Sequence, residues 1–256
     1  MNISIIITAA GSGSRFGGDT PKQLTLLNGL PMLIHSIMPF LDIANLQDVC
    51  GPDTLDIESI IVTASKHHHS QIQSIIETHI NAYNNPSNIP INVIEGGDTR
   101  QISVKNAVNN CRDGSMHSSS PVSGILIHDG ARPFITTAVI KRVLNQVHEN
   151  PQVNLAVIPV VDVTDTIKQV KGNTVQVHLD RAQLGAVQTP QYFDLMTLTK
   201  AYESVDIHDS TISITDESML MESINVPVKT CKGDPKNIKV TYASDIAHTQ
   251  SEPMGN

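Results

Sequence analysis

Two cations and several glycines near the N-terminus have the types and spacing needed to hold a phosphate group. Gly11, Gly13, Arg15 and Lys22 follow an apolar run over residues 3–7. A short run rich in β-branched residues predicts a buried parallel strand, and glycines directly after it let the backbone approach a bulky ligand. Backbone N–H groups together with an arginine and a lysine supply dipoles and charges for a polyanion. The stretch therefore predicts a phosphate-binding loop.

Three kinds of glycine-rich loop compete for this stretch. A Walker loop requires a lysine followed by serine or threonine at a fixed spacing, which the sequence lacks. A dinucleotide fingerprint requires a helix after the glycines, but Asp19 and Pro21 interrupt one. The third pattern fits throughout, because AAGSGSRF followed by PKQ, Ala9 to Gln23, resembles the signature loop of nucleotidyltransferases that activate phosphorylated sugars and polyols.

Polar residues also follow two later predicted strands. The pattern GGDTRQIS, residues 96–103, places glycines and a helix N-terminus at a strand end, where a ligand can bind, although a plain strand-to-helix turn would look similar. Asp129 ends the predicted strand 124–128 and could hold Mg²⁺, which takes hard oxygen ligands shared with substrate phosphates. The alternative is an aspartate that caps the next helix.

Alternating strands and helices must position these residues. The pattern predicts strands at 3–7, 57–63, 91–95, 124–128 and 153–158, with helices at 31–41, 66–80, 99–110 and 136–149. Pro39 is expected to end or kink the first helix. Further along the chain we expect strands at 187–191, 226–230 and 237–241, helices at 193–202 and 243–249, and a short helix capped by Thr215. The fold class is α/β, a Rossmann-like nucleotidyltransferase fold with a mostly parallel twisted sheet flanked by helices.

A protruding β-arm interrupts this alternation. Residues 160–170 and 174–179 are joined by Lys171-Gly172-Asn173, which predicts a half-exposed hairpin. A two-stranded hairpin is marginally stable alone, so a second subunit is its natural support. We therefore expect a single domain over residues 1–256, with an arm at about 160–182 that forms a homodimer.

Composition limits the partners. With 17 Lys+Arg against 25 Asp+Glu, the formal net charge of −8 argues against a general nucleic-acid or anionic-membrane surface. No signal segment or apolar membrane span is recognisable, and the scattered Cys50, Cys111 and Cys231 are read as free thiols without a metal role. The expected location is cytoplasmic.

Several motifs stand in a characteristic order, namely AAGSGSRF, PKQ, GGDTRQIS, HDGARP, QTPQ, ITDE and DPKNIKVT. Over about residues 3–248 the chain resembles the cytidylyltransferases that make 4-diphosphocytidyl-2-C-methyl-D-erythritol in the non-mevalonate isoprenoid pathway. The resemblance implies transfer of the cytidylyl group of CTP to 2-C-methyl-D-erythritol 4-phosphate, with Mg²⁺ as cofactor and pyrophosphate as leaving group. A phosphate acceptor is already ionised and needs no general base, consistent with the lack of an obvious Ser/His/Asp constellation in the sequence.

The resemblance also implies roles for individual residues. Catalytic cations would be Arg15, Lys22 and Lys239, and Asp129 would hold the metal. Ala9, Ala10, Gly11, Gly13, Gly97, Asp98 and Ser103 would surround CTP. Asp165, Thr166, Arg181, Thr189, Thr215 and Arg132 would serve the acceptor, with Arg132 supporting the metal loop and the arm residues reaching the site of the other subunit.

One departure keeps a second acceptor open. Gly130 follows Asp129 where some relatives carry alanine, and glycine recurs there in the related ribitol-5-phosphate cytidylyltransferases. The pairs Asp165-Thr166 and Asp180-Arg181 favour methylerythritol phosphate.

Overall fold

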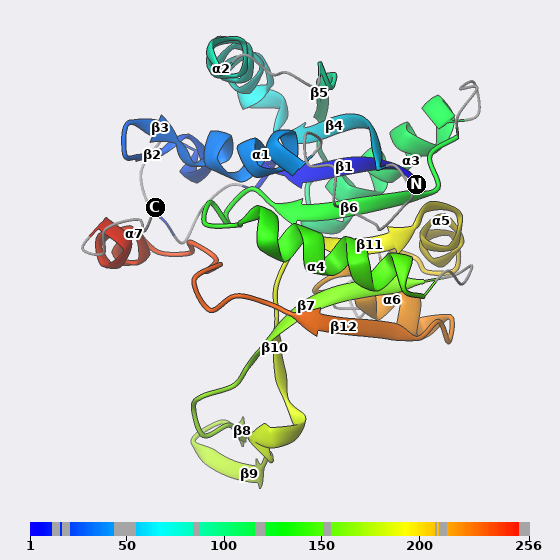
Figure 1. The fold of residues 1–256 in the computed structure, drawn as a ribbon. Coiled ribbons are helices and arrows are strands. Elements are labelled where there is room, and N and C mark those ends of the chain that lie inside the picture. Colours follow the sequence, from blue (N-terminus) through cyan, green and yellow to red (C-terminus); the bar gives the residue numbers. More distant parts are fainter. Residues whose placement is uncertain are drawn as a thin grey trace.

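The apolar run near the N-terminus forms a central strand of the sheet in a computed structural model (Figure 1). The structure describes residues 1–11, 16, 21–43, 55–83, 88–115, 121–150, 155–207, 209 and 214–250. Within these residues, eight strands form one sheet. They are β1 (Asn2–Thr8), β4 (Asp56–Ala64), β5 (Ile91–Glu95), β6 (Gly124–Asp129), β7 (Ala156–Asp162), β10 (Gly185–Val187), β11 (Gln191–Asp194) and β12 (Val228–Lys232).

The sheet is mostly parallel, as the sequence predicts. Strand β1 pairs in parallel with β4 and β6, β4 pairs in parallel with β5, and β7 does so with β12. Strand β11 runs antiparallel between β6 and β7, and β10 is antiparallel to β7. In this register Thr8 lies opposite both Thr63 and Asp129, so the carboxyl ends of three strands meet at one edge.

Helices cover both faces of the sheet. Along β1, Ile3, Ile5 and Ile7 join the core under α1, α2 and α4, whereas Ile6 joins the core under α3, α5 and α6, because successive side chains of a strand point to opposite faces. The helices are α1 (Met32–Ile43), α2 (His69–Ala82), α3 (Arg100–Ser115), α4 (Thr137–His148), α5 (Leu195–Glu203), α6 (Glu217–Ser223) and α7 (Ala243–Gln250), with 3₁₀ turns at Lys22–Leu24, Lys66–His68 and Arg181–Gln183.

Two small hairpins lie outside the sheet. Strands β2 (Leu26–Leu27) and β3 (Leu30–Pro31) pair beside the start of α1. Strands β8 (Lys168–Lys171) and β9 (Thr174–His178) pair with each other and protrude from the body of the molecule (Figure 1). The predicted hairpin is present, but all residues of β8 and β9 are exposed rather than half of them, because the arm protrudes and its own chain covers neither face.

Three local predictions are corrected. Helix α1 does not end at Pro39 but continues to Ile43, because Phe40, Leu41 and Ile43 are buried in the core and compensate for the missing backbone donor. Asp216, not Thr215, caps α6, because its carboxylate accepts a hydrogen bond from the Met219 N–H at 3.4 Å.

The third wrong prediction is the strand at 237–241, which is irregular in the structure. Scattered partners bond to the backbone of this segment in place of a neighbouring strand. Arg132 donates to the Asn237 carbonyl, the Val240 N–H donates to the Ala131 carbonyl, and Asp245 accepts from the Thr241 N–H. The predicted strand 187–191 is present only at its two ends, in β10 and β11.

Two further observations bear on composition. No described helix is long and apolar enough to cross a membrane. Cys111 and Cys231 are free thiols, and Cys50 lies outside the described residues.

Candidate active site

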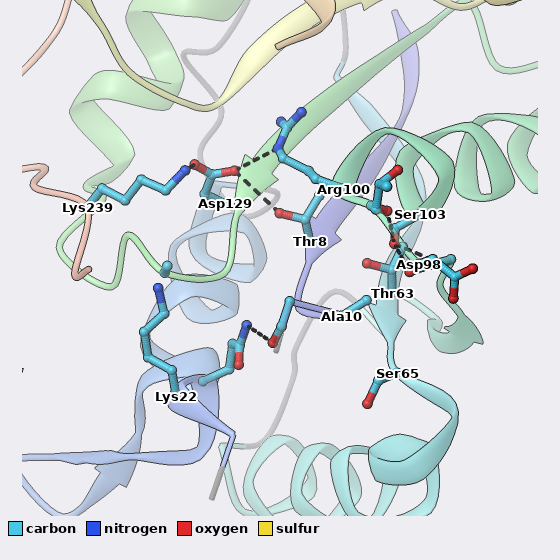
Figure 2. A pocket seen from close by; sticks show the side chains of 15 residues that line it. Thr8, Ala10, Lys22, Thr63, Ser65, Asp98, Arg100, Ser103, Asp129 and Lys239 are labelled. Atoms are coloured by element: carbon cyan, nitrogen blue, oxygen red, sulfur yellow. Dashed lines mark hydrogen bonds and ion pairs between the residues drawn. The ribbon is translucent and has the colours of Figure 1, made fainter. Parts of the chain in front are cut away.

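A cavity of about 330 Å³ opens at the carboxyl ends of β1, β4 and β6 (Figure 2). This is the edge at which parallel α/β sheets bind ligands, because the strand ends diverge there and helix N-termini point toward the opening. The lining residues are Thr8, Ala10, Gly11, Lys22, Gln23, Thr63, Ser65, Gly97, Asp98, Thr99, Arg100, Ser103, Asp129, Ala131 and Lys239.

Asp129, at the end of β6, is the acidic centre of the cavity and is only 5 % exposed. Its carboxylate lies 2.7 Å from the Lys239 ammonium, 3.4 Å from Arg100 Nε and 3.8 Å from Arg132 Nε. The Thr8 hydroxyl donates to the same carboxylate at 3.4 Å. Burial alone would raise the pKa of Asp129, but the three cations outweigh it and hold the pKa well below its usual range.

A buried hydrogen-bond chain holds Asp129 in place. The Asp129 N–H donates to Thr189 Oγ1 at 3.1 Å, and Thr189 Oγ1 lies 2.9 Å from His128 Nδ1. His128 Nε2 lies 3.2 Å from the carbonyl oxygen of Arg132. Burial lowers the pKa of His128 to about 4, so the imidazole is neutral. Since a carbonyl can only accept, Nε2 carries the proton, and Nδ1 accepts from the Thr189 hydroxyl.

Residues 233–240 deliver Lys239 to Asp129 and are tied to the body by side chains. Gln188 donates to the Asp234 carbonyl at 2.8 Å, Arg132 to the Asn237 carbonyl at 2.8 Å, and Asn237 to the Thr189 carbonyl at 2.9 Å. Asn237 is fully buried, so its bond to the Thr189 carbonyl is shielded from water.

Lys22 joins the same cluster from the other end of the chain. Its ammonium donates to the carbonyl oxygen of Val240 at 2.7 Å, one residue after Lys239. Two of the three predicted catalytic cations, Lys22 and Lys239, therefore line one cavity although more than two hundred residues separate them in sequence.

The other half of the cavity is built from backbone and small side chains. The Ala9 N–H donates to the Thr63 carbonyl at 3.0 Å, and the Gly97 N–H donates to Ser103 Oγ at 2.9 Å. A Cβ on Gly96 would lie 2.5 Å from that of Ala10, so glycine is needed for this close approach. Ala10, Gly11, Gly97, Asp98 and Ser103, all expected around the nucleotide, line the cavity together, and Ala9 is buried behind it.

The remaining predicted residues lie elsewhere. Asp165, Thr166 and Arg181 are exposed at the base of the arm, where Arg181 donates to the Thr164 carbonyl at 2.5 Å. Thr215 is exposed and contacts Met219. Thr189 is buried beneath the cavity, with its hydroxyl engaged by His128 and Asp129. Arg15 and Gly13 lie outside the described residues.

Arg100 is the functional residue to which sequence reasoning gave no role. Its guanidinium lines the cavity and contacts Asp129, because Arg100 begins α3 directly after the GGDT turn. The signal was present in the GGDTRQIS pattern, but sequence does not reveal that this turn faces the end of β6.

A mostly parallel sheet with a cation-lined cavity at its carboxyl edge fits the nucleotidyltransferase class that the sequence motifs predict. Comparison with known families narrows the class. The model of the 2-C-methyl-D-erythritol 4-phosphate cytidylyltransferase family matches residues 3–252, and the chain belongs to this family. The family catalyses CTP-dependent cytidylyl transfer, so the chain is an enzyme of isoprenoid biosynthesis.

Individual relatives agree with this assignment. A 2-C-methyl-D-erythritol 4-phosphate cytidylyltransferase of Bacillus thuringiensis is 32% identical over 248 residues, which are 97% of this chain and 96% of the relative. A bifunctional enzyme IspD/IspF of Solidesulfovibrio magneticus is 34% identical over 251 residues; the match covers 96% of this chain and 56% of that longer protein. The solved 4-diphosphocytidyl-2C-methyl-D-erythritol synthase of Anaerococcus prevotii has a TM-score of 0.73 at 25% identity, covering 97% of this chain and 96% of the other.

Proposed function

We propose that this chain binds CTP in the cavity and transfers its cytidylyl group to 2-C-methyl-D-erythritol 4-phosphate. An oxygen of the acceptor phosphate attacks the α-phosphorus in line, a new P–O bond forms, and the bond to pyrophosphate breaks. Such transfers need positioning and charge stabilisation more than covalent help, because two anions must meet. The observation that carries the proposal is the cluster of Arg100, Arg132 and Lys239 around Asp129 at the cavity wall.

In this proposal one half of the cavity binds the cytidine and the other half binds the triphosphate. Ala9, Ala10, Gly11, Gly13, Gly97, Asp98 and Ser103 bind the cytidine and the adjoining phosphate. Lys22 and Lys239 lie in the described half that would receive the triphosphate, and Arg15 is assigned there from the motif. Preorganised cations of this kind stabilise charge that develops on the phosphoryl oxygens in the transition state.

The donor set suits Mg²⁺ as the cofactor. Asp129 offers two carboxylate oxygens and the Thr8 hydroxyl lies beside them, all hard ligands. Among the described residues there is no group of three acidic, histidine or cysteine side chains that could form an all-protein cage. A single carboxylate fits an ion that takes its other ligands from water and substrate phosphates. Bound there, Mg²⁺ would neutralise phosphate charge, while this chain's own lysines orient the triphosphate.

The acceptor is assigned to the arm of a second copy of the chain. Asp165, Thr166 and Arg181 do not line the cavity of their own chain. The arm exposes Val170, Val175 and Val177, which a partner would cover. A homodimer in which each arm reaches the other cavity would supply these residues to the acceptor, with Arg132, Thr189 and Thr215 belonging to the receiving chain. Because CTP and the acceptor are charged metabolites, we place the reaction in the cytoplasm.

Gly130 does not decide between acceptors. A Cβ at this position would lie 2.9 Å from the Thr8 carbonyl oxygen and 3.4 Å from Ile7 and Leu33. The tight approach of β6 to β1 therefore accounts for glycine here without reference to the acceptor. Ribitol 5-phosphate remains the alternative substrate on the basis of that family resemblance.

The experiment that tests the proposal measures pyrophosphate release from CTP and Mg²⁺ with each acceptor. Release with methylerythritol phosphate, and much less with ribitol phosphate, is the expected result. Release only with ribitol phosphate would keep the CTP half of the site but overturn the roles of Asp165, Thr166 and Arg181. Failure of both acceptors would overturn the proposed function.

A further inference from the structure

Glu217 is a fully buried carboxylate behind the wall of the cavity. It begins helix α6, does not line the cavity, and accepts hydrogen bonds from Arg100 Nη1 at 2.8 Å and from the Tyr202 hydroxyl at 3.1 Å. A buried carboxylate is costly unless a cation and further donors compensate for its lost hydration. Burial and the neighbouring Glu217 carboxylate raise the pKa of Tyr202. The hydroxyl therefore remains a donor to Glu217.

Arg100 joins Glu217 to the reaction site. Its Nη1 faces Glu217, whereas its Nε lies 3.4 Å from Asp129 Oδ1, and its side chain ends beside Asp129 in Figure 2. Burial alone would lower the pKa of Arg100, but Glu217 and Asp129 outweigh it and raise the pKa, so the guanidinium stays charged. A planar guanidinium held at two edges has little freedom to rotate.

The number of cations around Asp129 explains why a second carboxylate, Glu217, is needed nearby. Asp129 lies within 4.0 Å of three cations, Arg100, Arg132 and Lys239. Among the described ion pairs, only Arg100 of these three also pairs with Glu217. Without the Glu217 charge, three cations would share one carboxylate, and Arg100 would be drawn wholly to Asp129. That pairing would occupy the oxygen atoms that the proposed function assigns to the metal.

We propose that Glu217 is a positioning residue: it holds Arg100 at the cavity wall and thereby keeps Asp129 available to Mg²⁺ and the CTP phosphates. The proposal rests on the proposed function, because Asp129 is the metal ligand there. Glu217 acts only through Arg100 and touches neither substrate nor metal. A buried pair that serves stability alone is the competing explanation, and such pairs are common enough to require a direct test.

The test is a cycle of Glu217→Gln, Arg100→Met and the double variant, with Glu222→Gln as matched control. Glutamine keeps the shape and one acceptor but removes the charge. Glu222 is exposed on the same helix. We expect Glu217→Gln to lower kcat/KM about tenfold or more, the scale found for residues that orient a metal ligand. In the Arg100→Met background the same substitution should cause no further loss, and Glu222→Gln should leave kcat/KM unchanged.

Isothermal titration of CTP provides a readout besides activity. In the wild-type protein, Mg²⁺ should strengthen CTP binding relative to EDTA. In Glu217→Gln this gain should shrink at least about threefold, because a more positive cluster binds a divalent cation less well. A purely structural role would lower the thermal unfolding temperature and leave the Mg²⁺ dependence of CTP affinity as in the wild type.

If the Arg100→Met protein does not fold, Tyr202→Phe tests whether Glu217 positions Arg100. It keeps both charges and removes only the hydroxyl bonded to Glu217, so a smaller change in the same direction is expected. Equal losses from Glu217→Gln in both Arg100 backgrounds, or an unchanged Mg²⁺ gain in Glu217→Gln and Tyr202→Phe, would overturn the proposal. A wild-type protein that makes no product would overturn the proposed function instead, while the titration would still report on Glu217.

Discussion

Among single residues, the candidate site depends on cations that distant parts of the chain bring to one cavity. Lys22 comes from the N-terminal motif, and Lys239 comes from a segment near the C-terminus. The Lys22 contact with the Val240 carbonyl places the two ammonium groups on the same side of the cavity. The charge that the proposed mechanism requires at the α-phosphate would therefore be in place before the substrate arrives.

Removing the Lys22 ammonium should slow the reaction without unfolding the protein. We expect Lys22→Ala to lower kcat by at least about two orders of magnitude, the scale for losing one preorganised transition-state donor. Steady-state pyrophosphate release measures the change, and circular dichroism checks the fold. Lys200→Ala, exposed on α5, is the matched control. Near-normal turnover in Lys22→Ala would exclude a phosphate role for this residue.

His128 should make the stability of the fold depend on pH. Its pKa is about 4 in the folded protein against 6.5 for an ordinary histidine. As the pH falls from 6.5 to 4, His128 binds a proton in the unfolded chain but stays neutral in the native protein. The contribution of His128 to the free energy of unfolding is therefore fully present above pH 6.5. It decreases toward pH 4 by about 3 kcal/mol at most.

Denaturant unfolding in EDTA between pH 4 and 7 measures this loss of free energy of unfolding. His128→Gln removes the titrating group, so its stability should vary less over the same range even if it is lower throughout. His67→Gln, an exposed histidine, should retain the wild-type slope. A wild-type slope in His128→Gln would show that other groups cause the dependence.

Among the structural elements, the segment 233–240 positions Lys239 beside Asp129. Gly233 begins it, and its N–H donates to the Val160 carbonyl at 2.7 Å. A Cβ at Gly233 would lie 2.6 Å from Gln188 Oε1 and 3.0 Å from the Val160 carbonyl oxygen. The segment can lie this close to β7 only with glycine at its start.

Gly233→Ala should therefore displace the segment 233–240 and, with it, Lys239. We expect a loss of about 1–3 kcal/mol of stability, typical of overpacking, together with a fall in kcat larger than the fall in CTP affinity. Thermal unfolding and steady-state kinetics measure the two effects. Gly114→Ala in α3, where a Cβ meets nothing within 4 Å, is the matched control. Wild-type kcat in Gly233→Ala would contradict the role of the segment.

Elements with a clear periodicity could be predicted from the sequence. Strand β5, Ile91–Glu95, matches its predicted range, because Pro90 before it and Gly96 after it mark its two ends. The strand at 237–241 could not be corrected from sequence, because Ala131 and Arg132, which bond to its backbone, lie about a hundred residues away in the chain. The same reason explains Arg100, whose contacts with Asp129 and Glu217 join three distant segments.

At the scale of the whole molecule, the cavity of one chain contains no arm residue. Asp165, Thr166 and Arg181 were assigned to the acceptor by resemblance, and their exposure at the base of the arm fits a role across a dimer. Sequence could predict that the arm exists, because the polar and apolar residues alternate around a Gly-Asn turn. It could not predict what the arm contacts, because that partner lies outside the chain.

Arg181→Ala should affect the acceptor alone. We expect the KM for methylerythritol phosphate to rise about tenfold or more, with the KM for CTP nearly unchanged, because Arg181 lies outside the nucleotide cavity. Lys171→Ala, exposed at the hairpin turn, is the matched control. A change confined to the KM for CTP would show that the arm does not bind the acceptor, and a monomer in analytical ultracentrifugation would exclude the dimer.

Oxygen isotopes in the acceptor phosphate can show directly which bonds form and break in the proposed cytidylyl transfer. The acceptor is prepared with ¹⁸O throughout its phosphate group, and the reaction with CTP is analysed by mass spectrometry. If the acceptor oxygen attacks the α-phosphorus of CTP, all of the label should appear in the diphosphocytidyl product and none in pyrophosphate. Label in the released pyrophosphate would contradict cytidylyl transfer by this route.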